Sequence, residues 1–312
     1  MMNINSRILI TGGYGLVGEA LREFLIDKGF KNLLTPRRAE CELRDFQAVK
    51  SYFEQHQPEY VFHLAAAVYG IMGNMQNKGS SFFDNVMINT HVVEASRLFK
   101  IKKITAMGTG AAYPYPSPGL PLKEDMIWQG RPHGAEDSYG QAKRAMLAQL
   151  EAYRESDGLN FSFVISGNLY GPHDKFDIHW GHVTPALVRK FFEAKRDHQK
   201  VSVWGNGSAK RDFLYAKDVA LALFNIMNSV EGPVNMASGE VHSIRELVDA
   251  LAEHTGMTTQ VEWDETKPNG QDYRAYDLTK LFSTGFKPMH SFKQAICETY
   301  DWYAAHAATA RS

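Results

Sequence analysis

The sequence predicts an α/β fold with a doubly wound parallel sheet and a smaller, mostly helical second unit toward the C-terminus. Three observations predict it. Up to residue 166, short apolar runs alternate with longer stretches of helical apolar spacing, which is the pattern of successive βαβ units. A glycine-rich segment separates the first run from the first stretch. After residue 167 the alternation stops and helical spacing dominates.

The elements of the sheet follow one another in a regular order. Arg7–Thr11 (RILIT) is a short apolar run before glycines, as expected of a buried parallel strand. Residues 15–27 then place apolar side chains at helical intervals. The same reasoning predicts further strands at 32–35, 60–64, 104–107 and 161–166, and further helices at 46–55, 84–99 and 138–155. A proline-rich loop precedes the last of these helices.

The second unit is predicted to form from interleaved segments. We expect a loop over 168–181, a helix over 182–194, a strand over 201–204, a helix over 244–255 and closing segments over 280–286 and 292–305, while 218–228 and 233–236 return to the main sheet. This gives two predicted domains: 1–167 with 213–243, and 168–212 with 244–312. The alanine-rich end, HAATARS, is expected to be frayed.

The composition excludes several classes of protein. The 34 basic and 35 acidic residues give a net charge of −1, so no basic surface for nucleic acid is expected. No apolar run approaches the ~20 residues of a membrane helix, and no signal peptide is expected before the first strand. The two cysteines, Cys41 and Cys297, are too few for a disulfide framework or a cysteine zinc site. A cytoplasmic enzyme or binding protein is expected.

A glycine-rich turn between the first strand and the first helix predicts a dinucleotide site of the Rossmann type. The turn reads Thr11-Gly12-Gly13-Tyr14-Gly15-Leu16-Val17-Gly18. Glycines allow a tight turn and close approach of the backbone to a pyrophosphate, and the helix N-terminus directs unpaired N–H groups at that anion. A plain strand–helix turn is the alternative. The strand before the turn and the helix after it favour the dinucleotide site.

Two arginines after the second strand favour NADP(H) over NAD(H). An NAD site usually carries an acidic residue about 20 positions beyond the turn, which binds the ribose 2′-hydroxyl. Here that position falls on Arg38, beside Arg37, and no acid precedes Glu40. Guanidinium groups suit a 2′-phosphate. NAD(H) remains possible, since both arginines can be ordinary solvated loop residues.

Thr109, Tyr139 and Lys143 form the predicted catalytic group. Tyr139 and Lys143 are four residues apart on one predicted helix, so they share a face. The ammonium is expected to lower the pKa of the phenol and to hold the hydroxyls of the nicotinamide ribose. Thr109 follows the fourth strand, at the edge where such folds bind ligands. A chance surface pair is the alternative, because the Tyr-x-x-x-Lys spacing is common in helices.

With these motifs the chain resembles the extended short-chain dehydrogenase/reductase family, and within it the GDP-L-fucose synthases. The resemblance spans about residues 6–304. It depends on the strings HLAA (63–66), NLYGPHD (168–174), HVTPAL (182–187), VWG (203–205) and RDF (211–213). It implies an oxidoreductase that acts on C4 of a GDP-sugar with NADP as cofactor.

The resemblance also implies roles for individual residues. The cofactor would contact turn residues 12–18, Arg37, Arg38, Leu43, Leu64, Ala65, Ala66, Met107, Gly108, Lys143, Ser166, Asn168, Leu169 and His182. The nucleotide-sugar would contact Thr109, Asn168, Lys190, Trp204, Arg211 and Asp277, with His182 beside the reacting sugar. Two of these cations can neutralise a diphosphate, and an indole can offer a stacking face. The alternatives are a core position for Trp204 and a carboxylate partner for Arg211.

The sequence departs from this family in two places. The family's Ser-Ser-Cys after the fourth strand reads Thr109-Gly110-Ala111 here. A methyl group thus replaces the thiol of the cysteine–histidine pair that epimerises C3 and C5, although His182 remains. This predicts a reductase without 3,5-epimerase activity. Tyr14 stands where the synthases have an arginine that helps to hold the NADP phosphate.

A metal site is not expected. His173, Asp174, Asp177, His179 and His182 gather polar side chains in one stretch, but their spacing fits no usual zinc pattern on a helix. The family resemblance accounts for the stretch without metal.

The leading hypothesis is therefore an NADPH-dependent C4 reductase of a GDP-4-keto sugar, either a 6-deoxyhexose or a heptose. An NAD-dependent GDP-sugar 4-dehydrogenase or 4-epimerase is the first alternative. A non-catalytic dinucleotide sensor is the second, although the intact catalytic group argues against it. A homodimer is expected to form through helices 84–99 and 138–155, whose apolar residues exceed one buried face: Val86, Ile88, Val92, Met146 and Leu150.

Overall fold

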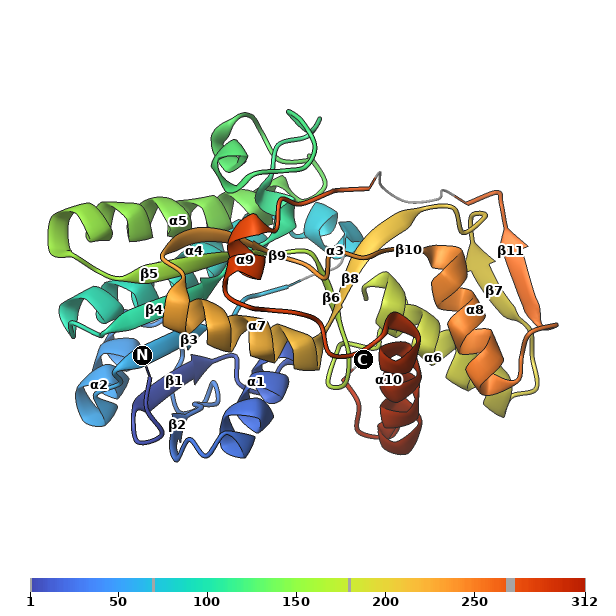
Figure 1. Cartoon of the computed structure of the whole chain (residues 1–312), viewed down its shortest axis with the longest axis horizontal. Helices are drawn as coiled ribbons and strands as arrows, with labels where there is room; N and C mark the ends of the chain where they lie inside the picture. The colour runs from blue at the N-terminus through green and yellow to red at the C-terminus, as the bar shows by residue number, and fades with distance from the viewer. Residues whose placement is uncertain (1, 69–70, 179–180, 268–272, 312) are drawn as a thin grey trace.

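The computed structural model describes residues 2–68, 71–178, 181–267 and 273–311. Within these ranges a six-stranded parallel sheet forms the centre of the molecule (Figure 1). In spatial order its strands are β2 (Asn32–Leu34), β1 (Arg7–Thr11), β3 (Tyr60–His63), β4 (Lys103–Met107), β5 (Phe161–Ser166) and β9 (Gly232–Met236). The strand order reverses between β1 and β3, and ligands bind at such a switch point in open α/β sheets.

Helices cover both faces of this sheet, and each face has its own apolar core. On one side lie α1 (Leu16–Asp27) and α7 (Ala216–Ser229), whose apolar residues share a core with β1 and β9. On the other side lie α2 (Phe46–His56), α4 (Lys78–Leu98) and α5 (Asp137–Asp157). Figure 1 shows α5 beside α4, and α7 beside α1. The predicted doubly wound α/β fold is confirmed.

A third apolar core holds the second part of the chain together. It contains residues of α6 (Val183–Arg196), α8 (Ile244–Thr255) and α10 (Phe292–His306). Two small sheets accompany these helices: β6 (Asn168–Tyr170), β8 (Lys210–Tyr215) and β10 (Val241–Ser243) form one, and β7 (Val201–Trp204) pairs with β11 (Val261–Asp264) in the other. Short helical segments complete the described chain: α3 (Ile71–Gln76), η1 (Gly110–Ala112), η2 (Glu124–Trp128) and α9 (Thr279–Ser283).

Two local predictions of element boundaries are wrong. Residues 168–181 are not all loop, because 168–170 form β6 beside β8. Helix α4 begins at Lys78 rather than at residue 84. Its first turns carry polar side chains, several of them buried, so they lack the apolar periodicity on which the prediction depended.

The alanine-rich end is also ordered up to the last described residue, contrary to expectation. Two of its alanines pack against the third core. The backbone N–H of Phe176 donates a hydrogen bond to the carbonyl of Arg311 over 2.8 Å. None of the helices in the described ranges is both long and apolar enough to span a bilayer.

Candidate active site

The glycine-rich turn follows β1 and packs directly against the end of β3. Gly12 has φ +71°, a left-handed conformation that favours glycine, and a Cβ there would lie 2.8 Å from the backbone nitrogen of Ala65. A Cβ on Gly18 would overlap the carbonyl oxygen of Gly12. The compact turn therefore depends on these two glycines. No side chain caps the N-terminus of α1 by a hydrogen bond, so its N–H groups can bind an anion, as a pyrophosphate site requires.

A buried histidine joins the ends of β1 and β3 beneath the turn. The hydroxyl of Thr11 lies 2.8 Å from Nδ1 of His63, and Nε2 of His63 lies 3.0 Å from Oδ1 of Asn89. Burial, and after it the charge of Lys143, lower the pKa of His63 to about 3, so the ring is neutral. Ala65 donates its backbone N–H to the Thr11 hydroxyl. The predicted cofactor-side edge at 64–66 is thus fixed to the turn.

Tyr14 orients one of the two predicted phosphate-binding arginines. The guanidinium carbon of Arg37 lies 3.8 Å from the centre of the Tyr14 ring, within cation–π range. Arg38 is largely exposed, and its Nε donates a hydrogen bond to Glu42 over 2.5 Å. Tyr14 stands where the family has an arginine, and its ring therefore holds Arg37 of the same chain beside the turn.

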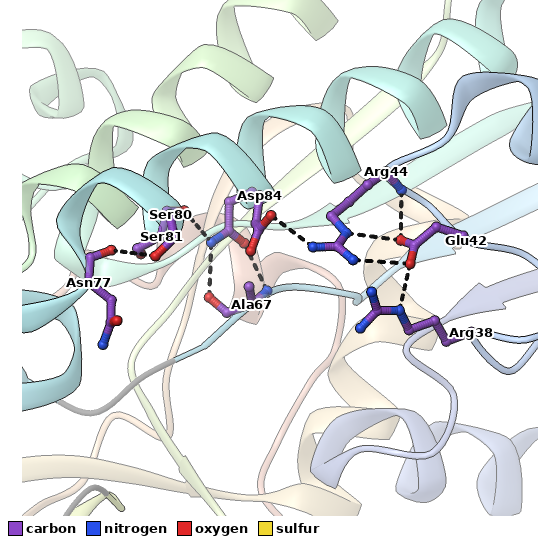
Figure 2. Close-up of polar contacts among 9 residues, drawn as sticks. Arg38, Glu42, Arg44, Ala67, Asn77, Ser80, Ser81 and Asp84 are labelled. Carbon is purple, nitrogen blue, oxygen red and sulfur yellow. Dashed lines mark hydrogen bonds and ion pairs between the residues drawn. The ribbon is translucent and has the colours of Figure 1, made fainter.

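Figure 2 shows how Glu42 connects Arg38 to helix α4. Arg44 also donates hydrogen bonds to Glu42, and it forms an ion pair with Asp84 of α4 at 3.1 Å. Ala67 follows β3, and its N–H donates a hydrogen bond to Oδ1 of Asn85 of α4 over 3.0 Å. These contacts fix both loops beside the turn to one helix.

Of the predicted catalytic residues, Thr109 lies directly before η1, whereas Tyr139 and Lys143 lie on α5. Helix α5 packs against η1. The hydroxyl of Thr109 accepts a hydrogen bond from the N–H of Ala111 over 3.2 Å. Arg144 on α5 donates to the carbonyl oxygens of Ala112 (2.8 Å) and Gly130 (2.7 Å). A Cβ on Gly140 would lie 2.7 Å from the carbonyl oxygen of Ala111. Glycine at 140 thus lets the start of α5 approach the backbone of Ala111, two residues after Thr109.

Tyr139 and Lys143 lie together on α5, but their protonation differs from the prediction. The ammonium nitrogen lies 5.8 Å from the centre of the phenol ring. Burial raises the pKa of Tyr139, and the carboxylate of Glu136 raises it further. The expectation that Lys143 lowers the pKa of this phenol is wrong, since desolvation outweighs an attraction at that distance. Tyr139 is therefore fully protonated at neutral pH.

Lys143 itself fits a bound dinucleotide. Its side chain is fully buried, its Nζ has no hydrogen-bond partner among the described residues, and burial lowers its pKa to about 7. Such an orphaned donor is costly unless a partner arrives, and ribose hydroxyls would supply one. Together with the glycine turn, this indicates that the residues present fit NAD(P).

Most of the remaining predicted cofactor residues lie at the carboxyl ends of β4 and β5 and at the start of β6. Gly108 extends β4 after Met107, and its N–H donates to the carbonyl oxygen of Val164 over 2.7 Å. Ser166 donates to the Gly108 carbonyl at 3.5 Å, and the Asn168 amide donates to the carbonyl oxygen of Asp212 at 3.2 Å. Two more predicted residues, Leu43 and Leu169, are partly buried against the apolar cores.

The predicted sugar-side residues come from the second part of the chain. Lys190 on α6 donates to the Ser202 carbonyl at 3.1 Å, and its ammonium lies 5.6 Å from the centre of the Trp204 ring. Trp204 is 60% exposed, so the alternative of a core position is wrong. Arg211 lies on β8, and His182 is an exposed residue that caps α6. Asp277 accepts a hydrogen bond from the N–H of Thr279 and has a lowered pKa for that reason.

Sequence reasoning missed three residues at this site. Glu136 raises the pKa of Tyr139 from one turn away on the helix. A guanidinium nitrogen of Arg311 lies 3.6 Å from the position of a Cβ on Gly15. The hydroxyl of Tyr276 lies against Gly110. Only Glu136 had a local signal, its helical spacing from Tyr139, because the other two are far from the site in sequence.

The histidine-rich stretch is the remaining candidate for a metal site. Among the described residues no group of three or more His, Cys, Asp or Glu side chains could hold a metal ion. Of the stretch, His179 lies outside the described residues. His173 packs its ring against Trp302 at 4.5 Å between ring centres.

A dinucleotide turn at the switch point, with Thr109 after β4 and with Tyr139 and Lys143 on the neighbouring helix α5, is the arrangement of an NAD(P)-dependent oxidoreductase. Comparison with known proteins gives the family. Residues 8–237 match the model of the NAD dependent epimerase/dehydratase family. The chain belongs to this family.

Individual relatives match over nearly the whole chain. GDP-L-fucose synthase 1 of Arabidopsis thaliana is 35% identical over 306 residues, covering 97% of this chain and 94% of its own. A GDP-L-fucose synthetase from Naegleria fowleri bound to NADP has a TM-score of 0.92 at 30% identity, covering 100% and 96%. A GDP-mannoheptose C4 reductase from Campylobacter jejuni with NADP bound has a TM-score of 0.87 at 30% identity, covering 97% and 99%. The predicted family and the predicted oxidoreductase class are confirmed.

Proposed function

We propose that the protein is a cytoplasmic, NADPH-dependent C4 reductase of a GDP-4-keto sugar, a 6-deoxyhexose or a heptose, without 3,5-epimerase activity. The observation that carries this proposal is the placement of a protonated Tyr139 on one helix with the buried Lys143, whose Nζ has no hydrogen-bond partner among the described residues. A phenol in this state can give a proton to a forming alkoxide. The substrate class is supported by the printed activities of the plant and Campylobacter relatives.

Thr109, Tyr139 and Lys143 would each have a part in this reaction. Reduced nicotinamide supplies the hydride. Thr109 would hold the substrate carbonyl through its hydroxyl, Tyr139 would donate the proton to the C4 oxygen, and Lys143 would hold the ribose hydroxyls. The fixed positions of η1 and α5 support these roles, because donors aimed at a developing charge need little reorganisation.

The GDP part of the substrate would lie along the second part of the chain. Lys190 and Arg211 would neutralise the diphosphate, and the exposed ring of Trp204 would stack on a flat group. Asp277, whose lowered pKa keeps it ionised, would accept hydrogen bonds from hydroxyl or amino groups. We propose that segments 1–167 with 213–243 bind NADP and that 168–212 with 244–312 bind the GDP-sugar.

The direct test is turnover. Purified protein with NADPH and either GDP-4-keto-6-deoxymannose or a GDP-4-keto heptose should show loss of NADPH absorbance that depends on the sugar. Omission of the sugar and the Tyr139→Phe variant are the controls. No turnover of either sugar would contradict the proposed function.

The double variant Arg37→Ala/Arg38→Ala should weaken NADPH binding much more than NADH binding. The lost contacts are with a 2′-phosphate that NADH lacks, and a hydrogen bond to a charged group contributes about 1.5–3 kcal/mol. Titration calorimetry with both cofactors measures the difference. Arg196→Ala, which removes an exposed arginine paired with Asp197, is the matched control. Equal losses for NADPH and NADH would show that Arg37 and Arg38 do not bind the 2′-phosphate.

We also propose a homodimer that pairs α4 and α5 with the same helices of a second copy. Val92, Met146 and Leu150 are buried within the chain, so the expectation that they remain for a partner is wrong. Other residues support the pairing. Phe82 and Phe83 of α4 are 44% and 61% exposed.

Light scattering at micromolar concentration should give the mass of a dimer. Helix α5 exposes Ala145, Ala148 and Ala152 on one stripe, which permits close approach of another helix. Ala148→Arg should therefore give a monomer, whereas Ala304→Arg, at an exposed alanine of α10, should leave the mass unchanged. A monomeric wild type would contradict the pairing.

A further inference from the structure

The hydroxyl of Tyr276 occupies the space that a side chain at position 110 would need. A Cβ built on Gly110 would overlap Oη of Tyr276, and it would lie 3.2 Å from the carbonyl oxygen of Ser166. Gly110 does not have a positive φ, so its backbone conformation does not require glycine. The requirement is one of space. Gly110 also lies between Thr109 and Ala111, so the Tyr276 hydroxyl reaches the catalytic segment from a distant part of the chain.

Several contacts hold this tyrosine in place. A Cβ built on Gly167 would lie 3.5 Å from the Tyr276 ring. The ring also packs against the apolar cores on both faces of the sheet. The backbone of Tyr276 forms a bridge with Leu122, whose carbonyl accepts the N–H of Asp277 over 2.9 Å. A side chain held on both its ring and its backbone is pre-organised, and this lowers the entropy lost when it binds a ligand.

The polar partner of Tyr276 leaves its proton available. The charge of Arg274 lies near the phenol and opposes the effect of burial on its pKa, and Arg274 pairs with Glu136 at 3.8 Å. A guanidinium can only donate, so the phenol can act toward Arg274 only as an acceptor, and its own O–H can donate to another group. Burial raises the pKa of Tyr276 to about 12. The group is therefore a hydrogen-bond donor at neutral pH and not a base.

We propose that Tyr276 is a specificity-determining residue, whose hydroxyl donates a hydrogen bond to a hydroxyl oxygen on the sugar carbon next to the carbonyl held by Thr109. It supplies the polar contact that glycine at position 110 cannot make. This inference rests on the proposed reductase function. It names the substrate class more closely: a 4-keto sugar that keeps a hydroxyl group beside the carbonyl.

A comparison of two substrates tests this contact. Tyr276→Phe should raise KM for GDP-4-keto-6-deoxymannose about tenfold, as expected for one lost hydrogen bond, with kcat changed less than about threefold. NADPH affinity should not change. On the 3-deoxy analogue, which lacks the hydroxyl, wild type and Tyr276→Phe should have equal KM values. Tyr113→Phe, which removes a neighbouring hydroxyl bonded to Asn235, should show no difference between the two sugars.

A steric exchange tests the same geometry independently. Gly110→Ser alone should reduce kcat/KM by more than tenfold, because its Cβ overlaps the phenol oxygen. Adding Tyr276→Ala should recover much of the loss, and thermal melts will show whether each variant is folded. An unchanged KM for Tyr276→Phe, equal losses on the two sugars, or a harmless Gly110→Ser would each overturn the proposal while wild-type turnover persists. Absence of wild-type turnover on both sugars would instead overturn the proposed function, and this inference with it.

Discussion

Replacing Tyr139 with phenylalanine is expected to lower kcat by about 10²–10⁴-fold, the usual contribution of a general acid. The substitution removes the proton that the reaction gives to the C4 oxygen and little else. Burial and Glu136 raise the pKa of this phenol, so it remains protonated through neutral and mildly alkaline pH. Cofactor affinity should stay close to that of the wild type, because Lys143 is unchanged.

Steady-state kinetics with NADPH and calorimetry of NADPH binding together check this result. Tyr153→Phe provides a matched control on the same helix, since Tyr153 lies near the other end of α5 and its ring contacts Arg97 of α4. Retention of more than about a tenth of the wild-type kcat would remove Tyr139 from the mechanism.

The second large expected effect is the absence of epimerisation. Inversion beside a ketone needs one group to remove a proton and another to return it on the opposite face. Ala111 is buried and carries only a methyl group at the position of the family's thiol. His182 could exchange a proton on one face but could not complete the inversion.

Neither cysteine of the chain offers a substitute. Cys41 precedes α2 and packs in the core beneath it, where burial raises its pKa to about 11. Cys297 lies on α10, near Lys293 and Asp301. Tyr276 reaches the catalytic segment but has a raised pKa of about 12, which makes it a poor proton-transfer group. These positions support a reductase that leaves C3 and C5 as they arrive.

Sequence reasoning predicted the local geometry of the candidate site where its residues lie close together in the chain. The glycine turn lies within one βαβ unit, and Tyr139 and Lys143 lie one helical turn apart, so local spacing predicted both. The main sheet was also predicted, because its strands are nearly continuous apolar runs.

The failures have physical causes. The pKa of Tyr139 depends on burial and on Glu136 more than on Lys143, and no spacing rule gives burial. Tyr276 reaches Gly110 only through its bridge with Leu122, and Arg311 reaches the dinucleotide turn only because the chain end is held by Phe176. Such contacts join segments far apart in sequence, and a single sequence contains no periodicity that reports them.

The most direct measurement of the central claim is NMR of the product formed from GDP-4-keto-6-deoxymannose and NADPH in D₂O. We expect a reduced C4, no inversion at C3 or C5, and deuterium at no more than one of these two carbons. A GDP-L-fucose synthase, assayed in parallel, provides the positive control for exchange with inversion. Deuterium at both C3 and C5 with inverted product stereochemistry would contradict the account, and would mean that another residue performs the role of the missing thiol.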